Sequence, residues 1–316
     1  MRIGIDMMGG DYAPEAAIEG SVLAREALPP DTEIVLFGSK DLITGKAREM
    51  NLDISGFELI HTPTWVEMGE HPLKSFSRKP DASIFLGQKH LRRGEVDGFC
   101  SAGNTGAMLI GAMQIITPVS GLIRPAISAL IPNMEGPDSV ILDVGLNPDA
   151  RPDVLYQYGM LGSMYARLVN QINTPRVSLL NIGEEEEKGN LVTRSTYQMM
   201  ADSDDFNFIG NMEANSLFVS AETDVLVCDG FVGNIVLKEA EAFYRLISSK
   251  KVCNGYFEMF NFENFGGTPV LGVNAPLVIG HGISNSKAIK NMIIQTGEVV
   301  GSGLTAHIKE TFNKQV

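Results

Sequence analysis

The fold class follows from residues 2–38, which read RIGIDMMGGDYAPEAAIEGSVLAREALPPDTEIVLFG. The apolar run Ile3–Asp6 predicts a strand, and Ala13–Leu28 predicts a helix with Pro14 in its first turn. Glu33–Phe37 predicts a second strand. Strands separated by helices pair in parallel through right-handed crossovers, so this stretch predicts a strand–helix–strand unit.

The same alternation continues along the chain. It predicts a layered α/β fold, three-layer α/β/α with a mostly parallel sheet. No repeat, low-complexity tract or Ser/Gly-rich linker divides the sequence, so we expect one domain over residues 1–316. The further predicted strands are Phe57–Thr62, Asp97–Cys100, Ser139–Val144, Arg176–Asn181, Asp224–Cys228 and Leu277–Gly280. The further predicted helices follow Ser39 and cover Asp153–Gln171, Asn190–Ala201, Asn234–Ser249 and Asn285–Lys314.

Composition excludes several classes of protein. The chain has 316 residues, 44% hydrophobic and 20% charged, which is a globular mixture rather than a disordered or fibrous one. A net charge of −13 argues against nucleic acid as a partner, because phosphate backbones require a basic footprint. Three cysteines outside any CxxC pair predict a reduced cytoplasmic location. Asp6 and Asp11 interrupt the start before a signal peptide could form, and no apolar run reaches 18 residues.

Glycine-rich loops follow most of the predicted strands. Glycine lets backbone approach a ligand closely, and a turn into a helix start offers free N–H groups to an anion. The carboxyl ends of parallel strands share one edge of a sheet, so these loops predict a phosphate-handling rim. The loops are MGGDYAP (8–14), SAGNTGA (101–107), DVGLNPD (143–149), NIGEEEEKGN (181–190), CDGFVGN (228–234) and GHGISNSKAIKN (280–291).

Each loop also has a simpler interpretation. Asn104 or Thr105 fits a helix N-cap, Glu184–Glu187 fits a solvated helix start, and His281 fits a turn. Cys100 ends a predicted strand without an evident base, which is more typical of a small buried hydrophobe than of a nucleophile. No histidine has metal-ligand spacing, and the sequence lacks GxGxxG, GxxxxGK[ST] and GxSxG, so we expect no metal and no cofactor.

Taken in order, these loops resemble one family, the bacterial phosphate acyltransferases of the PlsX type. The chain departs from its usual pattern at Tyr12, where His is common, and at Leu146 and Ala150, where Ala and Cys are common. Its aromatic arm, at about 240–265, also looks shorter. The matching stretches run from residue 6 to residue 291: DMMGGDYAPE (6–15), SAGNTGA (101–107), DVGLN (143–147), NIGEEEEKGN (181–190), FIGNMEA (208–214), CDGFVGNIVLK (228–238), GGTPVLGVN (266–274) and HGISNSKAIKN (281–291).

The resemblance implies an activity. Such enzymes transfer a long-chain acyl group from acyl carrier protein to inorganic phosphate, and the acyl phosphate serves phospholipid synthesis. The fold implied is similar to phosphate acetyltransferases and isocitrate-dehydrogenase-like enzymes, without a prosthetic group. A homodimer is implied, peripherally associated with the inner face of the cell membrane or with the downstream glycerol-phosphate acyltransferase.

This reaction suggests roles for the loop residues. We expect backbone N–H groups around Ser101–Gly106 and the ammonium of Lys188 to hold phosphate. The oxyanion needs donors, for which the candidates are Asn104, Asn147 and Asn234, while His281 is the candidate general acid. Direct attack by phosphate in a ternary complex is favoured over an acyl-enzyme. The other predicted phosphate- or substrate-binding residues are Gly9, Gly10, Asp11, Ser101, Gly103, Thr105, Gly106, Asn190, Asp229 and Lys287.

Two surface features predict partners. Residues 71–93 carry a net charge of +5 in an otherwise acidic chain, which fits either a solvated helix face or a dock for the acidic carrier protein. Seven of the 23 aromatic residues lie between Phe243 and Phe265, which fits core packing, a dimer contact or an anionic membrane surface. The predicted docking residues are Lys74, Arg78, Lys79, Lys89, Arg92 and Arg93.

Two other functions remain open from the sequence. A dehydrogenase of the isocitrate type would need metal-binding aspartates, an arginine cluster and a nucleotide loop, and the sequence shows none of these patterns. A non-catalytic scaffold at the membrane would recruit carrier protein through residues 71–93 and the aromatic arm. Turnover of an acyl carrier substrate distinguishes the scaffold from the enzyme.

Overall fold

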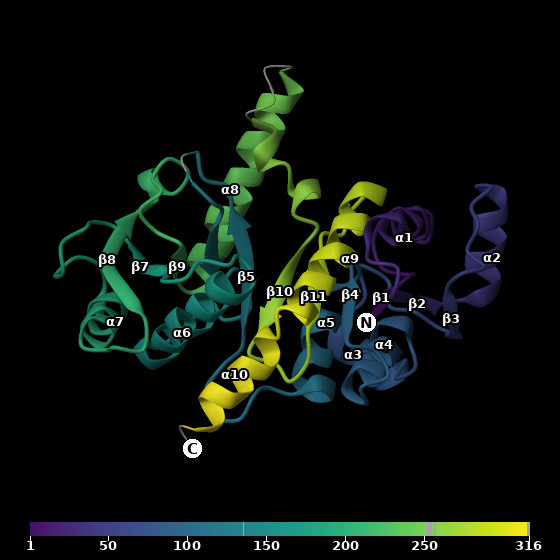
Figure 1. Ribbon diagram of the computed structural model, residues 1–316, viewed down its shortest axis with the longest axis horizontal. Helices are drawn as coiled ribbons and strands as arrows, with labels where there is room; N and C mark the ends of the chain where they lie inside the picture. The colour runs from purple at the N-terminus through teal and green to yellow at the C-terminus, as the bar shows by residue number, and fades with distance from the viewer. Residues whose placement is uncertain (135, 251–254, 256, 315–316) are drawn as a thin grey trace. The chain divides into compact units, whose positions relative to one another are not determined.

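The computed structural model describes residues 1–134, 136–250, 255 and 257–314 (Figure 1). They form two compact units, each built from two separate stretches of chain. Unit 1 comprises Met1–Val119 and Phe262–Gly301, and unit 2 comprises Ser120–Asn261 and Ser302–Val316. One domain over residues 1–316, with an arm at about 240–265, stays a prediction.

Unit 1 orders its strands β3-β2-β1-β4-β11-β10. All neighbours pair in parallel except β10 and β11, which are antiparallel. The strands are β1 (Arg2–Asp6), β2 (Glu33–Gly38), β3 (Glu58–His61), β4 (Gly98–Ser101), β10 (Gly267–Leu271) and β11 (Leu277–Gly280). The helices are α1 (Glu15–Ala27), α2 (Lys40–Glu49), α3 (Pro72–Arg78), α4 (Ser83–Arg92), α5 (Thr105–Gly111) and α9 (Ser286–Gly301), with a π-helical segment at Ala112–Ile116 and a 3-10 turn at Phe262–Asn264.

Successive side chains of β1 point to opposite faces of the sheet, and helices cover both faces. Ile3 and Ile5 are fully buried in one apolar cluster with residues of α1, α2 and α9. Gly4 lies on the opposite face, against the rings of Phe37 and Phe99. Helix α4 packs on that second face, which gives unit 1 its three layers.

Unit 2 orders its strands β5-β6-β9-β7-β8, and only β5 and β6 are antiparallel neighbours among its described pairs. Helix α6 packs on β6 and β9, and α7 packs beside it on β7 and β8. The strands are β5 (Ala126–Ile131), β6 (Ser139–Leu142), β7 (Arg176–Asn181), β8 (Asn207–Glu213) and β9 (Val225–Val227). The helices are α6 (Pro152–Leu168), α7 (Leu191–Ala201), α8 (Gly230–Ser249) and α10 (Leu304–Asn313), with short turns at Ala214–Ser216 and Phe257–Phe260.

The predicted mostly parallel α/β architecture is confirmed, with several differences in its elements. Strands β5, β8 and β10 and helices α3 and α4 were not predicted, whereas α5 follows the predicted SAGNTGA loop, where a helix N-cap was expected. The long helix expected over Asn285–Lys314 is two helices, because Gly303 takes a left-handed conformation (φ 69°) that ends the helical path. Within the described residues, no helix is both long and apolar enough to cross a membrane.

Close packing of α4 on the sheet depends on Gly87. A Cβ atom at this position would overlap the ring of Phe99, which is fully buried. We expect Gly87→Ala to lower the free energy of unfolding by about 1–3 kcal/mol, as overpacked cores do. Urea unfolding, followed by circular dichroism, measures this change in the free energy of unfolding.

Gly45→Ala is the matched control, because Gly45 lies inside α2 with no atom near its missing Cβ. That change should stabilise the protein by up to about 1 kcal/mol through helix propensity. Equal unfolding midpoints for the two variants would contradict the packing argument.

Candidate functional site

Three loops of unit 1 meet where the strand order reverses. The chain runs outward from β1 through β2 to β3, and β4 then returns to the other side of β1, with β11 next. Open α/β sheets bind ligands beyond the carboxyl ends of the strands at such a point. The predicted loops after β1, β4 and β11 therefore share one edge, and the amide of Asp11 donates to the carbonyl of Gly282 (2.8 Å).

A buried carboxylate, Asp6, joins two of these loops. Its Oδ2 accepts a hydrogen bond from Ser101 Oγ (2.8 Å), and its Oδ1 accepts one from the amide of Met8 (3.1 Å). Ser101 Oγ in turn accepts from the amide of Gly103 (2.9 Å). Burial raises the pKa of Asp6, and its hydrogen bonds partly offset this effect. No role was predicted for Asp6, although it opens the motif DMMGGD.

The glycines of these loops allow their close approach. A Cβ at Gly9 would lie 2.6 Å from the backbone nitrogen of Gly103, and Gly10 has a φ of 106°. Larger residues would therefore separate the loops or strain the backbone. Of the predicted residues, the structure brings together Gly9, Gly10, Asp11, Ser101 and Gly103.

The Asn104 side chain is bonded within the protein. Its Oδ1 accepts from the amide of Ala107 (3.0 Å) and caps α5. Its Nδ2 donates to the carbonyls of Met68 (3.0 Å) and Glu70 (2.9 Å). This geometry matches the N-cap interpretation, and the role of Asn104 toward an oxyanion stays a prediction.

The remaining predicted residues of unit 1 lie around this edge. Thr105 is exposed, and Gly106 lies against Pro72. His281 is half-buried, and its ring contacts that of Phe262 in a tilted arrangement, with centroids 5.2 Å apart and an interplanar angle of 40°. Lys287 is exposed in the first turn of α9.

Unit 2 contains a second buried carboxylate, Asp143, directly after β6. Its oxygens accept hydrogen bonds from the amides of Ile127 (3.0 Å), Leu146 (3.2 Å) and Asn147 (2.6 Å). The Asn147 side chain donates to Asp143 Oδ2 (3.1 Å) and to the carbonyl of Pro125 (2.7 Å). Asn147, predicted as an oxyanion donor, is thus held in place by Asp143, a residue to which the sequence argument gave no role.

The start of α8 packs directly on this loop. Asp229 caps the helix by accepting from the amide of Val232 (2.8 Å), and the amide of Gly230 donates to the carbonyl of Asn147 (2.8 Å). Asn234 is exposed and lies beside Gly145. The predicted residues Asn147, Asp229 and Asn234 are therefore neighbours.

The loop after β7 carries the other predicted residues of unit 2. Asn190 caps α7 by accepting from the amide of Thr193 (2.9 Å). Lys188 is exposed and forms an ion pair with Glu185 (3.8 Å). Asn181 Nδ2 donates to the carbonyl of Lys188 (3.2 Å), which holds the loop against the strand.

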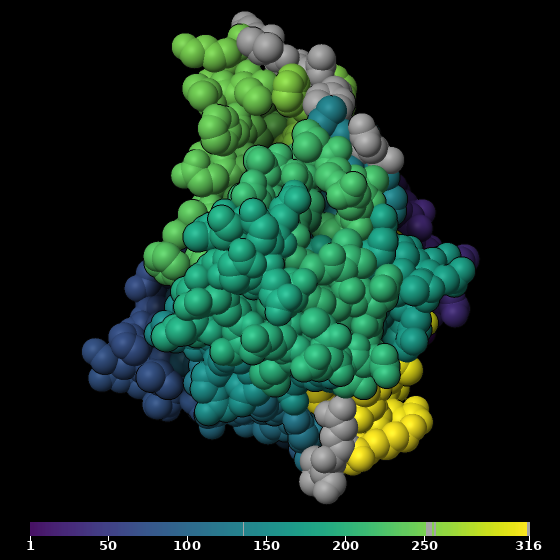
Figure 2. Space-filling view, turned by 90° about the vertical axis from the view of Figure 1, so that its left-hand side faces the viewer, coloured from purple at the N-terminus to yellow at the C-terminus, as the bar shows by residue number. Residues whose placement is uncertain are grey.

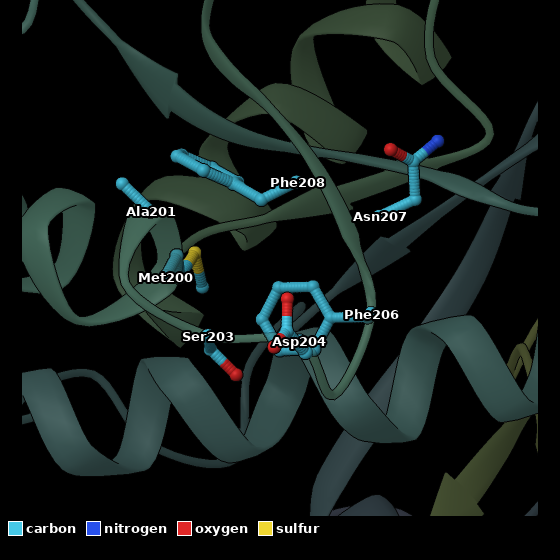
Figure 3. A pocket seen from close by; sticks show the side chains of 7 residues that line it. All are labelled: Met200, Ala201, Ser203, Asp204, Phe206, Asn207 and Phe208. Carbon is cyan, nitrogen blue, oxygen red and sulfur yellow. The ribbon is translucent and has the colours of Figure 1, made fainter.

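Among the described residues of unit 2, cavities open at opposite ends of the strands. One, of about 400 Å³, lies at the end of α7 and the start of β8, with Met200, Phe206 and Phe208 around it (Figure 3). The other, of about 340 Å³, lies beyond the carboxyl ends of β7 and β9, where Asn190 and Asp229 line it. The second cavity therefore lies at the candidate loops of unit 2, and its apolar lining could not be predicted from local motifs.

The described cysteines are poor nucleophiles. Burial raises the pKa of Cys100 to about 12, and it raises the pKa of Cys228 as well. Because the thiolate is the reactive form, both side chains are suited to packing. Cys253 lies outside the described residues.

The basic stretch 71–93 divides into two kinds of cation. Lys79 pairs with Glu70, and Lys89 pairs with Asp81 (3.0 Å). The others are exposed, and among them only Arg93 has an ion-pair partner in the described part of the chain, Glu95 at 3.9 Å. The exposed cations are Lys74 and Arg78 on α3, Arg92 at the end of α4, and Arg93.

Helix α8 exposes apolar side chains along its length. Phe231, Ile235, Phe243 and Leu246 each have about half or more of their surface accessible. Figure 2 shows this green segment at the surface. Lys251 and Tyr256 of the predicted aromatic arm lie outside the described residues, while Phe260 packs against Phe218.

Comparison with known proteins decides the family. The family described as "Fatty acid synthesis protein" matches residues 1–252. The phosphate acyltransferase of Desulfitobacterium hafniense is 39% identical, covering 98% of this chain and 97% of its own. The phosphate acyltransferase of Dictyoglomus turgidum is 36% identical, and the match covers 99% of this chain and 98% of that protein. This chain belongs to the phosphate acyltransferase family. The acyltransferase activity inferred from the resemblance is confirmed at this level.

Solved structures show how widely this fold is shared. A phosphotransacetylase from Streptococcus pyogenes superposes with a TM-score of 0.66 at 17% identity, covering 95% of this chain and 94% of its own. A 4-hydroxythreonine-4-phosphate dehydrogenase from Klebsiella pneumoniae superposes with a TM-score of 0.60 at 12% identity. The match covers 95% of this chain and 99% of that protein. The predicted fold is confirmed, and it is shared by phosphotransacetylases and by a dehydrogenase.

The raised pKa of Asp6 makes a prediction about stability. A carboxyl whose pKa is raised by folding stabilises the protein fully below its unfolded pKa of 3.8, and this contribution is lost as pH rises through the raised value. Asp6→Asn removes the titration. We expect the unfolding free energy of the wild type to fall relative to that of Asp6→Asn as pH rises above about 4 and through the raised pKa of Asp6. Parallel pH dependence in urea unfolding of the two proteins would contradict this.

Proposed function

We propose that the protein transfers a fatty acyl group from acyl carrier protein to inorganic phosphate, giving acyl phosphate for phospholipid synthesis. The observation that carries the proposal is the match to phosphate acyltransferases over nearly the whole chain, together with the pre-built loops of unit 1. The family description, "Fatty acid synthesis protein", supports a fatty acyl group as the one transferred.

The proposed chemistry is a direct displacement. A phosphate oxygen attacks the thioester carbonyl carbon, the new C–O bond forms, and the C–S bond breaks to release the carrier thiolate, which takes up a proton. A thiol with a pKa of about 8.5 is a good leaving group, so weak acid assistance is sufficient. Burial of Cys100 and Cys228, with raised pKa values, disfavours an acyl-enzyme and supports the ternary complex.

We place phosphate at the loops of unit 1. The Gly9–Gly10 turn brings backbone to the edge of the sheet, and Thr105 offers an exposed hydroxyl there. Ser101 positions its loop through the hydrogen bond to Asp6, because its hydroxyl already donates to that carboxylate. Holding these loops before substrate arrives reduces the reorganisation that the transition state would otherwise require.

The test is thiol release from palmitoyl acyl carrier protein, with and without inorganic phosphate, with hydroxylamine to trap acyl phosphate. We expect release that depends strictly on phosphate and yields a trappable product. Phosphate-independent release would instead indicate hydrolysis through an acyl-enzyme. No release by folded protein would favour a non-catalytic scaffold.

We also propose that the exposed cations of residues 71–93 dock the acidic carrier protein. Lys79 and Lys89 are engaged within the protein, so Lys74, Arg78, Arg92 and Arg93 are the cations available at the surface. Long-range attraction of this kind weakens with salt. The overall charge of −13 would otherwise repel an acidic partner.

Charge reversal tests this dock. We expect the Arg92→Glu/Arg93→Glu double variant to raise KM for the carrier substrate by about tenfold at low salt, with kcat little changed. Lys40→Glu/Arg48→Glu reverses two exposed cations on α2 and serves as the control. Equal KM values for the two double variants would remove residues 92 and 93 from the dock.

Further, we propose that α8 forms a homodimer contact and assists peripheral association with the inner face of the membrane or with the downstream acyltransferase. The exposed residues Phe231, Ile235, Phe243 and Leu246 support an apolar partner, since exposed apolar patches mark interaction surfaces. Arg245 and Lys250 add positive charge near the end of this helix, which suits anionic lipid.

A further inference from the structure

The cavity of about 340 Å³ in unit 2 has apolar walls. It lies where α6, α7 and α8 begin, beyond the carboxyl ends of β7 and β9. Its size falls within the range of about 300–1,000 Å³ that is usual for small-molecule sites. The apolar side chains that line it include Leu155, Leu179, Leu180, Val192 and Val232.

Most polar side chains at this cavity are engaged within the protein, whereas the carboxylate of Asp149, which also lines it, is exposed to solvent. Asn190 and Asp229 each accept from a backbone amide of the helix they cap, at 2.9 and 2.8 Å. Arg151 makes two hydrogen bonds to the carboxylate of Asp153, at 3.1 and 2.7 Å. The Sγ of Cys228 lies 3.6 Å from the carbonyl oxygen of Asp143. A polar ligand would therefore lose hydrogen bonds to water with little in exchange, whereas an apolar chain loses none.

The cavity extends inward from an accessible rim. Val232 on the first turn of α8 is 38% exposed, whereas Leu155 is only 2% exposed. Asp229 and Val232, which line the cavity, belong to the same start of α8 that packs on the Asn147 loop. The cavity thus opens beside candidate catalytic residues of unit 2.

From these observations we propose that this cavity binds the hydrocarbon chain of the acyl substrate and sets the preferred chain length. The inference rests on the proposed function for the identity of the ligand. Each methylene buried in such a cavity increases affinity about fourfold, so the depth of the cavity selects among acyl chains. Reducing the depth of the cavity should lower the affinity for long acyl chains and leave the affinity for short ones little changed.

Val192→Phe and Val232→Trp are the test variants, because each adds volume to one wall. Leu191→Phe is the matched control for Val192→Phe, because Leu191 is adjacent in sequence, 76% exposed and absent from the lining. Leu42→Trp on α2 is the control for Val232→Trp, because Leu42 is 47% exposed and also absent from the lining. Transfer to phosphate is measured with octanoyl and palmitoyl carrier protein, and binding of free octanoate and palmitate is measured by calorimetry. Thermal unfolding checks the fold of each variant.

We expect the test variants to raise KM for the palmitoyl substrate by at least about tenfold, equivalent to two or more lost methylenes, with KM for the octanoyl substrate little changed. Palmitate binding should weaken in parallel, and the controls should match the wild type. Equal effects on both chain lengths would overturn the inference, because the cavity would then hold a part common to all substrates. Unchanged chain-length profiles in both folded test variants would overturn it as well.

The two failures are distinguishable. A wild type that transfers acyl groups, with test variants that keep its chain-length profile, overturns the cavity assignment and leaves the proposed function standing. A wild type that makes no acyl phosphate overturns the proposed function. In that case, weaker palmitate binding in Val192→Phe than in Leu191→Phe would still support an apolar-chain site, and equal binding would overturn it.

Discussion

In each unit, a buried carboxylate holds the candidate loops in place. Asp6 is the last residue of β1 and Asp143 directly follows β6, and each is almost completely removed from water. A carboxyl in such a place is costly unless neighbouring donors satisfy it, so the loops that supply those donors are fixed around it. Ser101 satisfies Asp6 from a neighbouring loop, and the amide and side chain of Asn147 satisfy Asp143. The arrangement of both loop clusters follows from this constraint.

Fold and chemistry are separable in this protein. Phosphotransacetylases and a 4-hydroxythreonine-4-phosphate dehydrogenase share its architecture at identities of 17% and 12%, so the layers and strand order do not specify a reaction. The family assignment instead rests on sequence identity of 36–39% over nearly the full chain. The structure adds chemical constraints, because buried thiols with raised pKa values are unsuited to carry an acyl group.

Much of the candidate site could be predicted from the sequence because its loops are local features. Strand-end motifs such as MGGD and SAGN have composition that identifies them without tertiary information, and the structure brings them together. The hydrogen-bond and ion-pair partners of the side chains were less predictable. Asn104 is an N-cap that also bonds two distant carbonyls, and Lys79 and Lys89 are engaged by acidic neighbours. Such partners depend on which chain segments become neighbours.

The sequence by itself determined the α/β class, the parallel pairing and the family, because periodicity, glycine placement and motif order are properties of local stretches. Only the tertiary structure decided that β10 runs antiparallel to β11, that Asp6 and Ser101 share a hydrogen bond, and that three helix starts enclose an apolar cavity. Residues such as Leu155, Val192 and Val232 look like ordinary core positions in the sequence. Their joint exposure to one cavity arises from packing among segments that are far apart along the chain.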